Sequence, residues 1–143
     1  RSHGTNIVDL DGDLINELIV SNGGPDFMWD KVREPNRHYE FDWAHEVRAM
    51  TVRPVGDGTH VSVDGIGTKL ELVTIAPDGT ERSIHRTLYG GTCFSAQQGF
   101  EVYFGLGDAI AVDRLVVQWT DGVTQTFRSG LAAGDRLLVN YPD

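Results

Sequence analysis

The chain has 143 residues, enough for one domain with a core or for a small domain with part of another. Hydrophobic residues make up 40% of it and glycine occurs 17 times, a composition typical of an all-β protein with many tight turns. The formal net charge of −9 argues against nucleic-acid binding, because phosphates favour a basic surface, and it is compatible with bound cations or basic partners.

Two further features limit the class of protein. No apolar run approaches the roughly 18 residues of a membrane-spanning helix, so no membrane span is predicted. Cys93 is the single cysteine, which rules out a disulfide within this sequence and indicates no redox compartment. The first five residues resemble a cut start rather than a natural beginning, and no signal peptide is recognised.

An acidic loop comes first in chain order. Carboxylates occupy its positions one, three, five and nine, and a backbone carbonyl at position seven adds an oxygen. Ca²⁺ takes six to eight oxygen ligands, and alternate carboxylates in a tight loop converge on one point. The expected ligands are Asp9, Asp11, Asp13, the carbonyl of Ile15, and Glu17. Val20 stands where an EF-hand needs its twelfth-position Glu, and residues 17–20 lead into a strand, so an EF-hand is excluded. An acidic turn without metal is the alternative.

This loop resembles the calcium loop of FG-GAP and VCBS-type β-propeller repeats, where Asp-x-Asp-x-Asp-Gly-x-x-Asp precedes a blade strand. Leu14 replaces the usual glycine and Glu17 the last aspartate. The resemblance implies that residues 5–42 form part of such a repeat, with a second strand over 36–41. One hairpin is marginal alone in water, so residues 5–42 should pack on the next domain, the rest of a propeller or a partner chain. The aromatic stretch 27–29 would then serve for docking.

From residue 47 onward, short apolar segments alternate with turn signals, which predicts an antiparallel β-sandwich or barrel. The expected strands cover 47–54, 68–76, 81–88, 100–104, 114–119, 124–127 and 136–140. Period-two alternation places Phe104 and Trp119 on buried faces. Gly105 and Gly107 are expected to supply a turn through positive φ.

Three pieces of this second half resemble the ASPIC/UnbV domain, which follows FG-GAP-type repeats in cartilage acidic protein-like proteins. They are Asp-Gly-Ile-Gly-Thr-Lys-Leu-Glu-Leu (64–72), Phe-Gly-Leu-Gly-Asp (104–108) and Val-Asp-Arg-Leu-Val-Val-Gln-Trp-x-Asp-Gly-Val-x-Gln-Thr (112–126). The resemblance implies a β-sandwich over 46–141 that acts, without catalysis, in adhesion to proteins or glycans in an extracellular or periplasmic setting. The usual first strand departs from the family pattern in this chain.

No catalytic constellation is predicted. The histidines lack zinc-ligand spacing, and Cys93 sits in an apolar stretch that favours a buried thiol over a nucleophile. Ser95 lacks a nucleophile elbow, and the glycines around 105–108 open no helix as a phosphate loop does. The alternatives are an accessory domain of a larger secreted enzyme and a carbohydrate-binding module with Trp29 and Trp43 as stacking residues.

Overall fold

The structure, a computed structural model, describes residues 2–22, 34–42, 47–91 and 96–143. All regular elements in these ranges are β-strands, which confirms the predicted all-β fold. No helix in them has the length and hydropathy to cross a membrane. The chain separates into two compact units, Arg1–Glu46 with Gly91–Gly99, and Val47–Gly90 with Phe100–Asp143.

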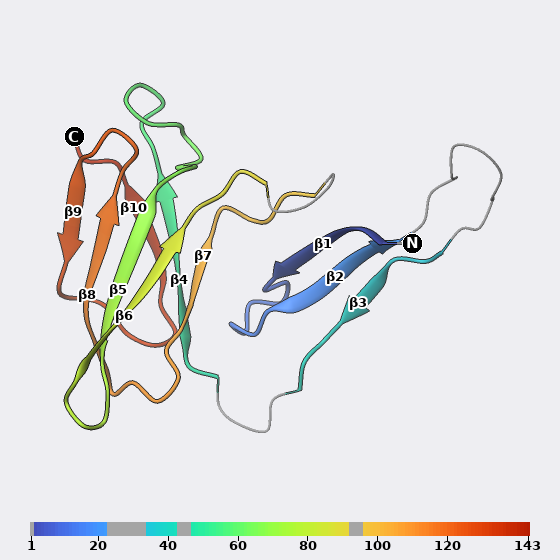
Figure 1. The fold of residues 1–143 in the computed structure, drawn as a ribbon, viewed down its shortest axis with the longest axis horizontal. Helices are drawn as coiled ribbons and strands as arrows, with labels where there is room; N and C mark the ends of the chain where they lie inside the picture. The colour runs from blue at the N-terminus through green and yellow to red at the C-terminus, as the bar shows by residue number, and fades with distance from the viewer. Residues whose placement is uncertain (1, 23–33, 43–46, 92–95) are drawn as a thin grey trace. The chain divides into compact units, whose positions relative to one another are not determined.

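The first unit contains one antiparallel sheet with the order β1-β2-β3 (Figure 1). Its strands are β1 (Ser2–Val8), β2 (Glu17–Asn22) and β3 (Arg37–Tyr39). Strands at 17–22 and 37–39 agree with the sequence-based expectation, whereas no strand was predicted before the acidic loop. The segment Ser2–Val8 has no clear alternation of apolar residues, and it is held as a strand by its pairing with β2.

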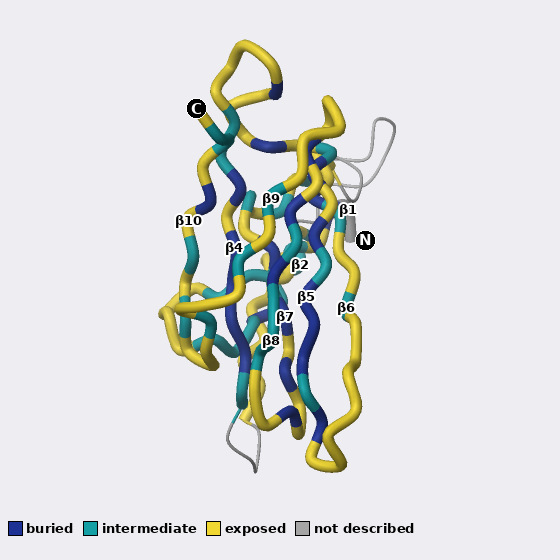
Figure 2. Tube along the Cα trace, turned by 90° about the vertical axis from the view of Figure 1, so that its left-hand side faces the viewer, coloured by how far each residue is buried: buried dark blue, intermediate teal, exposed yellow. Residues whose placement is uncertain are grey.

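The second unit contains two sheets that pack as a β-sandwich (Figures 1 and 2). One sheet has the order β10-β4-β7 and the other β6-β5-β8-β9. The strands are β4 (Ala49–Val55), β5 (Lys69–Ile75), β6 (Glu81–Thr87), β7 (Val102–Gly105), β8 (Ala111–Gln118), β9 (Thr124–Phe127) and β10 (Arg136–Asn140). All neighbours in these two sheets are antiparallel except β10 and β4, which run parallel.

The core lies between these two sheets, and strands of both contribute side chains to it. Trp119 and Phe104 are 1% and 0% exposed, as predicted. Figure 2 shows β5 largely buried and the edge strand β6 largely exposed. Alternation therefore identified the buried faces correctly, because side chains at every second position share one face of a strand. The largest buried side chains are those of Trp119, Phe104, Met50, Leu70, Leu72 and Leu115.

Pro54 lies within β4, the central strand of its sheet. The N–H of Thr51 donates to the carbonyl of Asp135, which lies just before β10. The backbone N–H and C=O groups of odd-numbered residues of β4 therefore face β10. The nitrogen of Pro54 therefore faces the β7 side, where pairing ends with Val52 opposite Val102. A proline is tolerated there because no ladder partner requires its missing N–H.

The turn after β7 uses glycine differently from the sequence-based prediction. Gly107 has φ of 56°, in the left-handed region that favours glycine. Gly105 instead ends β7 without a positive φ, so the prediction was wrong for this residue. It pairs with Ala49 as an ordinary strand residue, and the turn needs only one left-handed position.

Candidate functional site

The loop of residues 9–16 joins β1 to β2 and carries most of the predicted metal ligands. Val8 lies opposite Glu17 in the ladder, so the two ends of the loop are held together. The carboxylates of Asp9, Asp11 and Glu17 each offer an oxygen, and these oxygens lie within 4.8 Å of one another. Two oxygens bound to one Ca²⁺ at 2.3–2.6 Å lie at most about 5 Å apart. The spacing of these three carboxylates therefore fits a single cation.

Backbone amides hold two of these carboxylates in place. The oxygens of Asp9 accept from the N–H groups of Gly12, at 2.7 Å, and Leu14, at 2.9 Å. Glu17 is 6% exposed, and its Oε2 accepts from the N–H of Leu10 at 2.7 Å. A carboxylate oxygen has two lone pairs, so an oxygen that accepts one amide can still ligate a cation. The loop is thus shaped by its own hydrogen bonds.

Asp13 is not in the group of three carboxylates. Its Oδ1 accepts from the N–H of Ile15 at 2.7 Å, and its own N–H donates to Asp11 at 3.2 Å. The structure therefore brings together three of the four predicted carboxylates. The roles of Asp13 and of the Ile15 carbonyl as ligands remain predictions.

Leu14 stands at the loop position where the propeller resemblance expects glycine. Its φ is 67°, and it is the one non-glycine residue with positive φ among those that the structure describes. A left-handed conformation costs an L-residue roughly 1–2 kcal/mol because its Cβ approaches the following carbonyl. Leu14 thus adopts a backbone conformation that usually requires glycine. In this conformation its N–H donates to Asp9.

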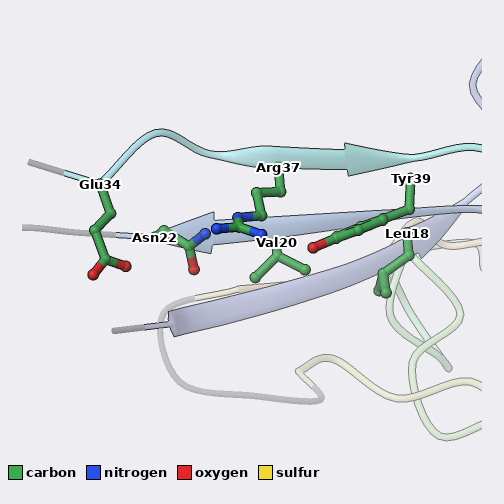
Figure 3. Close-up of a pocket in the computed structure, with 6 residues that line it drawn as sticks. All are labelled: Leu18, Val20, Asn22, Glu34, Arg37 and Tyr39. Carbon is green, nitrogen blue, oxygen red and sulfur yellow. The ribbon is translucent and has the colours of Figure 1, made fainter.

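A groove lies along β2 and β3 in the same unit (Figure 3). Leu18 lies opposite Tyr39 and Val20 opposite Arg37, so alternate positions of both strands line it. Asn22 and Glu34 complete the lining. A side-chain hydrogen bond to Tyr39 raises the pKa of Arg37. Sequence reasoning missed this groove, although the alternation of Leu18, Val20 and Asn22 was visible as a strand face.

Comparison with known families decides the identity of the second half. The family model described as ASPIC and UnbV matches residues 58–143, from the β4–β5 loop to the last residue of the sequence. The chain belongs to the ASPIC/UnbV family. No curated protein matches the chain. The ASPIC/UnbV match begins after the acidic loop, so the likeness of residues 5–42 to an FG-GAP repeat stays a prediction.

The remaining sequence-based candidates fall into two groups, those outside the described residues and those within the second unit. Trp29, Trp43, Cys93 and Ser95, and the aromatic stretch 27–29, lie outside the described residues. In the ASPIC/UnbV domain, Asp108 accepts a hydrogen bond from Arg82 at 2.6 Å. This contact between β6 and the turn after β7 is an exposed ion pair, of the kind that contributes about 0–1 kcal/mol.

Proposed function

We propose that this ASPIC/UnbV chain is a non-catalytic interaction module whose first unit is stabilised by Ca²⁺. The observation that carries the calcium part is the convergence of Asp9, Asp11 and Glu17 within 4.8 Å. Three carboxylates at this spacing repel one another, and a hard cation with oxygen ligands relieves the repulsion. The net charge of −9 also favours the binding of a cation.

These carboxylates would hold the ion, with Asp13 and the carbonyl of Ile15 as further ligands. Bound Ca²⁺ would supply positive charge and cross-link the two ends of the β1–β2 loop. The left-handed Leu14 strains the loop, so we expect weak affinity, roughly 10⁻⁴–10⁻³ M, the range of extracellular calcium modules. Such affinity suits the extracellular or periplasmic setting that we propose for the protein.

Thermal unfolding in millimolar Ca²⁺ and in chelator tests this proposal. A ligand that binds the folded state raises the melting temperature by an amount that grows with its concentration. We expect that response in the wild-type chain and its loss in Asp11→Asn. Asp78→Asn, which removes an equal charge from an exposed turn of the second unit, should keep it. Coincident wild-type curves in calcium and in chelator would exclude the metal and leave an ordinary acidic turn.

The interaction part of the proposal is supported by the groove on β2 and β3. It combines an apolar floor, a cation, a carboxylate, an amide and an aromatic ring that is 41% exposed (Figure 3). A mixed lining of this kind suits a protein or glycan partner, because polar groups fix orientation while apolar surface supplies affinity. Partner binding that survives both Tyr39→Ala and Arg37→Ala would show that the partner docks elsewhere.

A further inference from the structure

Three segments of the sandwich meet at one end, and Tyr141 links them. They are the β4–β5 loop, the β8–β9 turn and the residues that follow β10, which Figure 1 shows at the same end of the two sheets. The N–H of Tyr141 donates to the carbonyl of Val55 at 2.8 Å. Its ring stacks on His60, with centroids 5.6 Å apart and an interplanar angle of 12°. It also meets Trp119 edge-on, with centroids 5.4 Å apart.

Two carboxylates bind the polar atoms of this stack. Asp57 Oδ2 lies 2.6 Å from Nδ1 of His60, and its Oδ1 accepts from the backbone N–H groups of residues 59–61. The hydroxyl of Tyr141 donates to Oδ2 of Asp121 at 2.6 Å. The imidazole and the phenol are therefore stacked face to face, and each is hydrogen-bonded to its own carboxylate.

The charged groups that act on His60 come from two elements. The hydrogen bond and charge of Asp57, in its own loop, raise the pKa of His60, and the charge of Asp121, in the β8–β9 turn, adds to this. The same bond holds the pKa of Asp57 well below its usual range. The bond to Asp121 raises the pKa of Tyr141 to about 12, so its hydroxyl keeps its proton as a donor at physiological pH.

We propose that Asp57, His60, Asp121 and Tyr141 form a pH-responsive clasp, which fixes the segment after β10 on the end of the sandwich in mild acid and loosens it above neutrality. The protonated imidazole attracts both carboxylates and the face of the Tyr141 ring. The neutral imidazole keeps only a hydrogen bond to Asp57 and the stack. The switch is thus the charge on one exposed imidazole, which is bonded to Asp57 of its own loop and stacked on Tyr141 after β10.

The pH range in which the clasp is stable follows from the directions in which the pKa values of His60 and Asp57 are shifted. The folded-state pKa of His60 is raised, so its contribution to stability is fully present below the ordinary value of 6.5 and is lost as the pH rises through the folded pKa. The folded-state pKa of Asp57 is lowered, so its contribution is present above the ordinary value of 3.8 and is lost as the pH falls through the folded pKa. The clasp is strongest between these two ordinary values.

An NMR titration of the full chain at low ionic strength tests the clasp. Two signals are followed, the His60 ring protons and the exchange protection of the Tyr141 amide, corrected for the intrinsic effect of pH. We expect the His60 midpoint to lie at a higher pH in the wild type than in Asp57→Asn. We also expect Tyr141 protection to fall several-fold from mild acid to pH above neutrality in the wild type.

Two variants make the outcome decisive. In His60→Gln the Tyr141 protection should no longer change with pH, because no group in the stack then titrates in that range. Tyr141→Phe keeps the stack and removes the bond to Asp121, so its His60 midpoint should still exceed that of Asp57→Asn. The clasp is overturned by equal His60 midpoints in wild type and Asp57→Asn, by flat wild-type protection, or by the same pH dependence in His60→Gln.

Discussion

At the scale of single residues, the most unusual backbone position among the described residues is Leu14. Its positive φ places a branched side chain where the loop geometry favours glycine. The acidic loop therefore combines three convergent carboxylates with a strained residue between them. That strain can be measured separately from side-chain contacts, because alanine and glycine differ mainly in backbone freedom.

We predict that Leu14→Gly is more stable than Leu14→Ala by about 1 kcal/mol, since both remove the leucine side chain and alanine alone retains the left-handed strain. Ile15 is the matched control, because its φ is not positive. There the order should reverse, with Ile15→Ala more stable than Ile15→Gly by about 0.5–1 kcal/mol. Urea unfolding, followed by signals of β1 and β2, gives both comparisons. The same order at both positions would contradict a strained Leu14.

At the scale of elements, β10 shows how a short strand closes the sandwich. It pairs in parallel with β4, and its residues alternate between the core and the outer face. Val139 is 5% exposed, whereas Leu138 is 63% exposed on the opposite face. Adjacent residues of one strand thus differ strongly in the apolar area that folding buries.

Val139→Ala should cost about 2 kcal/mol, from the lost burial of two methyl groups and the cavity left behind. Leu138→Ala, although it removes a larger side chain, should change the free energy of unfolding by no more than about 0.5 kcal/mol. Both values come from chemical denaturation of the full chain. A larger cost for Leu138→Ala than for Val139→Ala would mean that the register of β10 is shifted by one residue.

The sequence predicted the positions of the strands more reliably than it predicted how the strands pair with one another. The bounds of β9 and β10 agree with the expected 124–127 and 136–140, because clear turns flank both segments. β1 was not predicted because its residues do not alternate between apolar and polar, and it is a strand only through its pairing with β2. The parallel direction of β10 was also not predictable, since a period of two residues is the same for either direction. The spacing of acidic residues likewise indicated Asp9, Asp11 and Glu17, whereas the His60–Tyr141 stack joins loops that no local pattern relates.

At the scale of the whole molecule, the acidic loop and the ASPIC/UnbV core belong to different compact units. An ion bound in the loop should therefore slow amide exchange in β1 and β2, while exchange in β5 and β8 stays unchanged. Hydrogen-exchange mass spectrometry with and without calcium measures this. Asp11→Asn should remove the protection of the first unit. Equal protection of both units would place the ion elsewhere or show that the units unfold together.

The parallel pairing of β4 with β10 also bears on how the protein is made. Thr51 finds its partner only when Arg136 is available, so β4 keeps one unpaired edge while nearly the whole second unit is synthesised. Pairings so distant along the chain make folding slow, and exposed edges invite pairing between chains. Arg53 is the one exposed residue within that strand, and it supplies a charge there. This charge would protect the nascent chain from aggregation during the delay.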